Sequence, residues 1–225
     1  MFEILKHPVR DYLRLRAHNL NSEEFRHLWL LAFWPVFGGL FWLVEVSIPL
    51  EACHEVYCRL DDYIPFVEYF VIPYLLWYVY LIGIHVYTLL YDVDAFRKLM
   101  KFVIITYSVT LLIYLIWPNC QMLRPEVFPR DNVFTNVIAG LYAADTNTNV
   151  CPSLHVVGSL AVCFTSWHCR GLHGKICRTG FNVAAILISV STVFMKQHSI
   201  IDILAAVALC VPMYWYCFRY DKKVP

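Results

Sequence analysis

The sequence predicts an all-α, polytopic membrane protein folded as a bundle of six transmembrane helices. Hydrophobic residues make up 60% of the 225 residues and the mean hydropathy is +0.56, whereas a soluble domain is only about half apolar. These residues are gathered in long segments with almost no charge. A helix needs roughly 20 mostly apolar residues to cross a bilayer core, with about 17 still tolerated. Six such helices in a soluble protein would leave too few polar residues to form its surface.

The six predicted helices are separated by connections of very unequal length. They cover residues 27–45, 65–91, 100–117, 152–169, 181–197 and 199–218. The fourth and fifth reach the required length only with their flanks. The third connection, Pro118–Cys151, is long and far more polar than its neighbours. We therefore expect one domain, residues 27–218, between an N-terminal tail of residues 1–26 and a C-terminal tail of residues 219–225.

The placement of lysine and arginine predicts the orientation of the bundle. Of the 18 such residues, only Arg59, Arg124, Arg130 and Lys196 fall in the odd-numbered connections. Cytoplasmic segments of membrane proteins carry the excess of positive charge. We therefore expect both termini in the cytoplasm of a multi-pass protein, with the cell membrane as the expected location. The first, third and fifth connections then face the non-cytoplasmic side.

The N-terminal tail and the cysteines leave alternatives open. The first 26 residues are polar and basic, so no cleavable signal peptide is expected. Their alternation of charged and apolar residues fits an interfacial helix, and a solvated tail fits as well. Cys53 and Cys58 share the first outer loop and are predicted to form a disulfide if that compartment is oxidising. No cysteine spacing resembles a zinc site, and we expect neither a metal nor a nucleic-acid partner.

Three short polar stretches are predicted to meet at the outer membrane face. His198 and Asp202 are four residues apart and share a helix face, so the carboxylate can orient the imidazole and leave its far nitrogen as a nucleophile. Ser153 and His155 open the fourth helix, whose free N–H groups favour an anion, and His155 can protonate a leaving oxygen. Arg124 can clamp phosphate oxygens.

Each stretch alone also has a purely structural explanation, as a helix cap or a lone surface residue. Two histidines, a carboxylate, a helix N-terminus and an arginine on one face together supply the parts for attack on phosphorus. The joint pattern therefore predicts phosphoryl transfer.

The same stretches resemble the motifs of the type 2 phosphatidic acid phosphatase superfamily. Its motifs are Lys-x6-Arg-Pro, Pro-Ser-Gly-His and Ser-Arg-x5-His-x3-Asp, and the chain matches their order over about residues 100–215. The resemblance implies a six-helix membrane bundle and a phosphohistidine intermediate on His198, oriented by Asp202, with His155 as general acid. It implies phosphate binding by Arg124 and Ser153, a lipid phosphate or diphosphate as substrate, and no metal or other cofactor.

Three departures from the motifs widen the range of functions. Trp117 stands in place of the lysine, Leu154 in place of the glycine and Thr192 in place of the second arginine. Lys196 is the candidate to replace one missing cation. This reduced set of phosphate-binding cations is similar to that of the inositol phosphorylceramide and sphingomyelin synthases, which transfer a headgroup to a lipid alcohol. A lipid phosphatase, a lipid phosphotransferase and a non-catalytic membrane protein are therefore all kept as hypotheses.

Three ionisable residues lie in or at the ends of predicted helices. Glu45 and Glu68 fall near the outer interface and His85 toward the inner one. Ionisable groups at membrane depth are candidates for function. Glu68 is the one that we expect near the site or a lipid headgroup.

Overall fold

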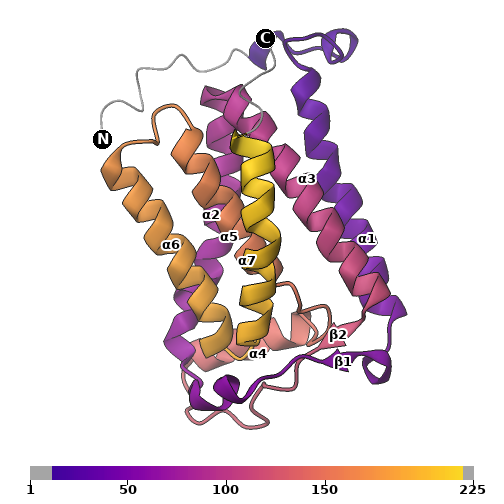
Figure 1. Ribbon diagram of the computed structural model, residues 1–225, viewed down its shortest axis with the longest axis vertical. Coiled ribbons are helices and arrows are strands. Elements are labelled where there is room, and N and C mark those ends of the chain that lie inside the picture. The colour runs from indigo at the N-terminus through magenta and orange to yellow at the C-terminus, as the bar shows by residue number, and fades with distance from the viewer. Residues whose placement is uncertain (1–11, 220–225) are drawn as a thin grey trace.

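The computed structural model describes residues 12–219 and is helical apart from one small sheet (Figure 1). Its α-helices are α1 (Phe33–Ser47), α2 (Val71–Tyr91), α3 (Val93–Ile116), α4 (Val133–Ala144), α5 (Leu154–His168), α6 (Lys175–Phe194) and α7 (Ile200–Tyr214). The expectations for residues 1–11 and 220–225 lie outside the described part.

Five helical segments are long and apolar enough to cross a membrane, by length and composition. They are Arg26–Ser47, Glu68–Tyr91, Val93–Ile116, Lys175–Phe194 and Ile200–Arg219. An integral membrane protein built of helices accounts for this set, because so many exposed apolar helices would not be stable in water.

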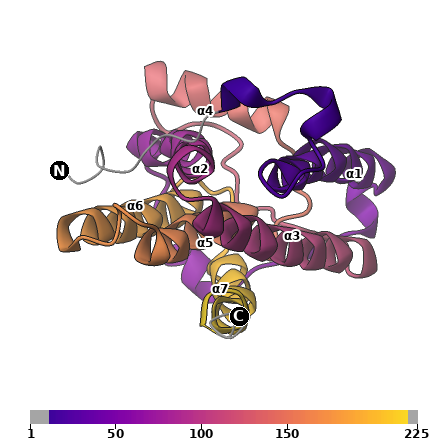
Figure 2. The same cartoon turned by 90° about the horizontal axis from the view of Figure 1, so that it is seen from above.

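Helix α5, the fourth predicted span, is the exception. It has 15 residues, which is below the length that crosses a bilayer core. Most of it is buried, because α2, α3, α6 and α7 surround it (Figure 2). A helix covered by its neighbours does not need the length of a lipid-facing one. The structure therefore supports five candidate spans around a short central helix.

Helices α3 and α6 begin earlier than the sequence predicted, and most of the tail for which an interfacial helix was one alternative lies outside the described residues. Helix α3 begins at Val93 because Asp92 caps it, accepting from the N–H of Ala95 at 3.1 Å. The same carboxylate accepts from the N–H of Arg170 at 2.7 Å, which ties the second connection to the fourth. Within residues 12–25 the chain forms only two short 3-10 turns, Tyr12–Arg14 and Ala17–Asn19.

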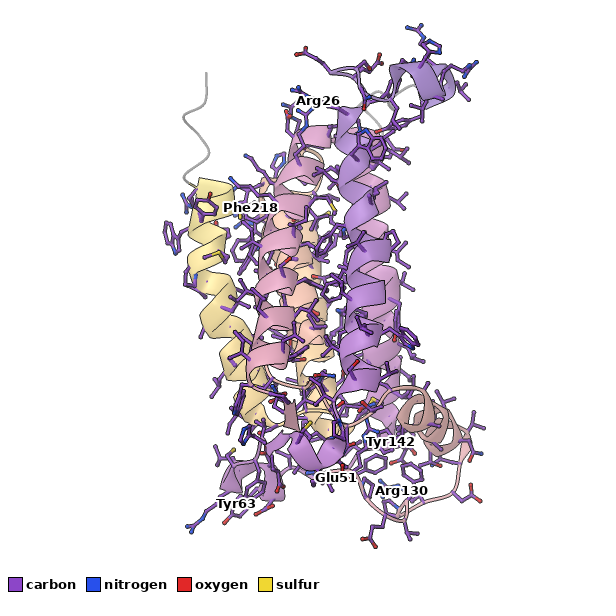
Figure 3. The ribbon with its side chains drawn as sticks, turned by 90° about the vertical axis from the view of Figure 1, so that its right-hand side faces the viewer. Arg26, Glu51, Tyr63, Arg130, Tyr142 and Phe218 are labelled. Carbon is purple, nitrogen blue, oxygen red and sulfur yellow. The ribbon has the colours of Figure 1, made fainter. Side chains whose placement is uncertain are left out.

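The long connections gather at the end of the bundle opposite the described termini. Arg26 and Phe218 lie at one end in Figure 3, and Glu51, Arg130 and Tyr142 lie at the other. Strand β1 (His54–Glu55) of the first connection pairs in parallel with β2 (Asn119–Cys120) of the third, with His54 opposite Asn119. This pairing brings the two outer loops together.

Helix α4, like strand β2, is an element of the third connection that the sequence did not predict. It lies across the end of the bundle, and Asn132 caps it by accepting from the N–H groups of Phe134 and Thr135 at 2.9 and 3.1 Å. Its Ile138 packs in a buried cluster with Val71, Tyr74 and Met195. The connection is therefore anchored to α2 and to the turn after α6.

The predicted Cys53–Cys58 disulfide is not formed, and all nine cysteines are free thiols. Cys53 lies just before β1, and its thiol donates to the carbonyl of Pro49 at 3.6 Å. Cys58 lies beyond β1 and caps the 3-10 turn Arg59–Tyr63, where its N–H donates to Asp61 Oδ2 at 2.9 Å. The two residues are therefore held by different local structures on either side of the strand.

Candidate active site

The N-terminal end of α5 is held by side chains that end and follow α3. Asn119 Oδ1 accepts from the N–H groups of Val150 and Cys151 at 2.9 and 2.8 Å. The Tyr114 hydroxyl donates to the carbonyl of Pro152 at 2.6 Å. These contacts satisfy buried backbone groups that a loop inside the protein would otherwise leave unpaired. They fix the position of Ser153 and His155.

The turn between α6 and α7 places His198 close to His155, with 5.8 Å between the ring centroids. The N–H groups of Gln197 and His198 both donate to the carbonyl of Thr192, at 2.9 and 3.2 Å. Buried Asp61, from the first outer loop, accepts from the Ser199 hydroxyl at 2.6 Å and from the N–H of Ile200 at 2.9 Å. A carboxylate is stabilised at a helix N-terminus, so Asp61 anchors the start of α7.

His198 and Asp202 form the predicted pair. Nδ1 of His198 lies 3.0 Å from Oδ2 of Asp202, which also accepts from the N–H of Ser199 at 3.0 Å. The Asp202 side chain is fully buried, and its backbone carbonyl accepts from the N–H of Ser153 at 3.2 Å. The carboxylate thus orients the imidazole so that Nε2 is left for other chemistry, and the same residue links α7 to the start of α5.

His155 faces His198 across a short gap. The ring centroids are 5.8 Å apart. The His155 ring packs against Tyr74 and Trp77, with centroid separations of 4.5 and 4.6 Å, and its Nε2 atom is buried without a hydrogen-bond partner among the described residues. Tyr74 and Trp77 of α2 therefore hold the His155 imidazole, and Asp202 of α7 holds the His198 imidazole.

A small cavity of about 50 Å³ opens between the two histidines. The residues that line it come from α1, α3, α5 and the two outer connections: Phe41, Tyr114, Asp145, Thr146, Thr148, Asn149, Val150, Leu154, His155, Gln197 and His198. Partial desolvation raises the pKa of Asp145 above its usual value, opposed by nearby His198 and Arg124, although the side chain keeps an exposed surface. Ser153 is fully buried beside this cavity with an unpaired hydroxyl, but it is not one of the lining residues.

Arg124 is more occupied by protein groups than its predicted role suggests. Its Nη1 donates to the carbonyls of Tyr142 and Asp145 at 3.2 and 2.9 Å, and its Nη2 donates to the Thr146 carbonyl at 2.7 Å and to Gln197 Oε1 at 2.5 Å. The guanidinium also stacks on the Tyr142 ring. Burial lowers its pKa, with Asp145 opposing that shift. Arg124 therefore organises the cavity wall, and its unpaired Nε is the donor left over.

Lys196 lies away from the cavity. Its Nζ donates to the carbonyl of Asp61 at 2.8 Å, and the residue is not among those that line the space between the histidines. Burial lowers the pKa of this amine, whereas Asp61 and Asp62 act in the opposite direction. The structure therefore shows Lys196 linking the turn before α7 to the first outer loop, outside the lining of the cavity.

The two glutamates differ in their relation to the site. Glu45 accepts a hydrogen bond from Asn149 at 2.8 Å and another from Thr146, so it supports two lining residues from α1. Glu68 is fully buried and accepts from Arg130 Nε and Nη2 at 2.7 and 2.6 Å. That pair links the start of α2 to the connection before α4. Glu68 therefore stabilises the fold and does not line the cavity.

Sequence reasoning missed Gln197, Asn149, Asp145 and Asp61. Gln197 and Asn149 line the cavity, are almost fully buried and each keep one unpaired amide atom. The only available signal was the polar character of the third connection and of the turn before α7. In the described part of the chain, no cluster of three or more His, Cys, Asp or Glu side chains is arranged to hold a metal ion.

The chain matches no model of a protein family, no curated protein and no solved structure. Its class as a helical protein with membrane-spanning segments therefore rests on its own helices, and the chemistry of its cavity is argued below from side chains alone.

Proposed function

We propose that this protein is an integral membrane lipid phosphatase that hydrolyses a lipid phosphate or diphosphate through a phosphohistidine on His198. The observation that carries the proposal is the buried His198–Asp202 pair at 3.0 Å, facing His155 at 5.8 Å between ring centroids across a small cavity. An oriented nucleophile and a proton donor on the two sides of one gap are the parts that covalent phosphoryl transfer needs.

The proposed reaction has two steps. Nε2 of His198 attacks phosphorus and forms a P–N bond, while the P–O bond to the lipid breaks and His155 gives its proton to the leaving oxygen. Water then attacks phosphorus, the P–N bond breaks, inorganic phosphate leaves, and the proton of the water returns to His155. The unpaired Nε2 of His155 is the atom available for this proton.

A lipid substrate is supported by an apolar groove next to the cavity. The groove has a volume of about 620 Å³ and runs along the seam between α1 and α3, with Leu40 and Val44 on one side and Leu111 and Leu115 on the other. Phe41 and Tyr114, from the same two helices, line the cavity between the histidines. A lipid tail in the groove would therefore hold its phosphate close to His198.

Transfer to an alcohol in place of water is the second candidate. The observation that favours it is the polar wall of the cavity, where Asp145, Thr148 and Asn149 present groups that can bind a hydroxyl. The same phosphohistidine would serve both reactions. Adding a lipid alcohol to the assay and following the phosphorylated product separates transfer from hydrolysis.

Catalysis is tested with two histidine variants in purified protein. His198→Ala should abolish phosphate release and remove the acid-labile phosphoenzyme trapped by rapid quenching. His155→Ala should spare an aryl phosphate, whose leaving group needs little protonation, and lose most activity on an alkyl phosphate. Measurable turnover by His198→Ala would exclude covalent catalysis at this residue, and an inactive wild-type protein would favour a non-catalytic role.

The proposed topology is a six-helix bundle, with α5 as its short central member, both termini in the cytoplasm and the cavity on the non-cytoplasmic face. The distribution of lysine and arginine supports this orientation. In a cysteine-free background, a membrane-impermeant thiol reagent added to intact cells should label Val127→Cys, which is exposed in the third connection, and should miss Glu23→Cys. The reverse pattern would place the cavity in the cytoplasm.

A further inference from the structure

Gln197 presents an unpaired donor to the cavity. Its Oε1 accepts from Arg124 Nη2 at 2.5 Å, and a guanidinium can only donate, so the orientation of the amide is fixed with Nε2 on the other side. Only 3% of the residue is exposed, and Nε2 has no hydrogen-bond partner among the described residues. Gln197 lines the cavity together with His155 and His198. Buried donors without a partner are rare in native proteins, so this one points to an acceptor on a ligand.

The position of Gln197 is fixed from two sides. Its backbone N–H donates to the carbonyl of Thr192 at 2.9 Å, and its side chain is held by Arg124 from the third connection. Thr192 has no charge, so α6 supplies no cation to the cavity at that position. Of the two residues next to His198 in the chain, Ser199 donates its hydroxyl to Asp61, whereas Gln197 lines the cavity and brings a neutral amide to it.

The charges around the cavity are mainly negative. Asp145 contributes the one carboxylate among the lining residues of the described chain, and no lysine or arginine is among them. Glu45 lies behind Asn149, and Asp202 lies behind His198. Arg124 is the cation on this wall, and four hydrogen bonds to protein oxygens already engage its guanidinium.

We propose that the Gln197 amide donates to a phosphoryl oxygen, and that the cavity therefore takes a phosphoryl group with one negative charge, a lipid phosphodiester, in preference to a dianionic phosphomonoester. A neutral donor provides a hydrogen bond without cancelling a full charge, and repulsion from Asp145 grows with each charge on the ligand. This inference rests on the proposed attack by His198 and changes the expected substrate from a lipid phosphomonoester to a lipid phosphodiester.

The reaction of a diester follows the same two steps. His198 Nε2 forms a bond to phosphorus, the P–O bond to one alcohol breaks, and the proton of His155 goes to the oxygen of that alcohol. Water then breaks the P–N bond and returns a proton to His155. The products are one alcohol and one phosphomonoester, so no oxidant or other co-reactant is required.

The experiment compares bis(4-nitrophenyl) phosphate with 4-nitrophenyl phosphate, which share a leaving group and differ in charge. At about pH 8 the monoester is a dianion, because its second pKa is roughly 6. We expect the wild-type protein to have a kcat/KM at least about tenfold higher for the diester, corresponding to about 1.4 kcal/mol of discrimination. Gln197→Glu keeps the acceptor for Arg124 and removes the donor, so kcat for the diester should fall by about 10²-fold or more, as with other lost oxyanion donors.

Gln121→Glu is the matched control. Gln121 is also fully buried, its Oε1 accepts from the N–H of Leu123 at 2.6 Å, and its Nε2 is likewise unpaired, but it does not line the cavity. The same chemical change there should leave the ratio of the two substrates unaltered. Asp145→Asn should raise the ratio of kcat/KM for the monoester to kcat/KM for the diester, because it removes one negative charge from the lining of the cavity.

Binding provides a readout that does not depend on turnover. Diethyl phosphate should raise the melting temperature of the His198→Ala protein more than inorganic phosphate does, and Gln197→Glu in the same background should remove that shift. A preference for the monoester, or equal binding with and without the Gln197 donor, would overturn the inference. Failure of the proposed catalytic function would appear differently, as turnover that survives His198→Ala.

Discussion

Asp202→Asn is the substitution that tests the proposed mechanism most directly. Asp202 Oδ2 lies 3.0 Å from His198 Nδ1 and 3.0 Å from the N–H of Ser199. Because one oxygen serves both groups, an asparagine whose amide oxygen takes that place can keep both hydrogen bonds. It removes the negative charge that stabilises the imidazole of His198 as Nε2 forms its bond to phosphorus. The substitution therefore removes a charge while it preserves the shape of the site.

The expected loss follows from the missing charge. The Asp-to-Asn change in serine proteases also alters the tautomer and lowers kcat by about 10⁴-fold, so that value is the upper limit and we expect a loss of about 10²- to 10⁴-fold here. This equals about 2.7–5.5 kcal/mol of transition-state stabilisation, at 1.36 kcal/mol for each factor of ten. The free energy of unfolding should change by only about 1 kcal/mol, because the amide still caps α7.

Asp61→Asn provides the matched control. Asp61 is also a buried carboxylate at the start of α7, where it accepts from Ser199 Oγ at 2.6 Å and from the N–H of Ile200 at 2.9 Å, but it does not hold His198. Both variants should be compared by phosphate release and by thermal unfolding in the same detergent. Retention of a tenth of wild-type kcat by Asp202→Asn, or an equal loss in Asp61→Asn, would refute the assigned role.

Two further predictions concern the stability of the fold. Arg130→Ala leaves the Glu68 carboxylate with Asn132 as its one side-chain donor among the described residues, whereas Glu68→Gln leaves a half-exposed arginine in water. Arg130→Ala should therefore lower the melting temperature more than Glu68→Gln does, and equal shifts in thermal unfolding would contradict this asymmetry. Gly158→Ala should lower the free energy of unfolding by about 1–3 kcal/mol, because the added Cβ would lie 2.7 Å from Tyr107 Oη. Gly83→Ala is the control, because its Cβ would enter open space. That variant should leave the thermal unfolding temperature unchanged or raise it.

The sequence predicted the parts of the fold that depend on local pattern. Long apolar segments identified the helices that are able to span a membrane, and the spacing of four residues placed His198 and Asp202 on one face of α7. The length of α5 was not predictable in this way. Its boundaries depend on Asn119 and Tyr114, which lie more than thirty residues earlier in the chain and hold the segment before it. The helix can be short because its neighbours cover it, and that property belongs to the packed bundle.

The function of a polar side chain in the cavity depends on which partners occupy its atoms. Arg124 is the type of residue that clamps a phosphate, yet its donors reach three backbone carbonyls and Gln197, 73 positions along the chain. Lys196 is two residues from His198 in sequence, yet it donates to Asp61 on the first outer loop. Gln197 has no charge and belongs to no motif, yet it lines the cavity with both histidines and keeps an unpaired amide nitrogen. The spacing along one helix gives no information about these contacts, because each is made between connections that only the folded chain brings together. For this reason we expect a substitution at Gln197 to discriminate between the charge states of a substrate more sharply than a substitution at Arg124 or Lys196.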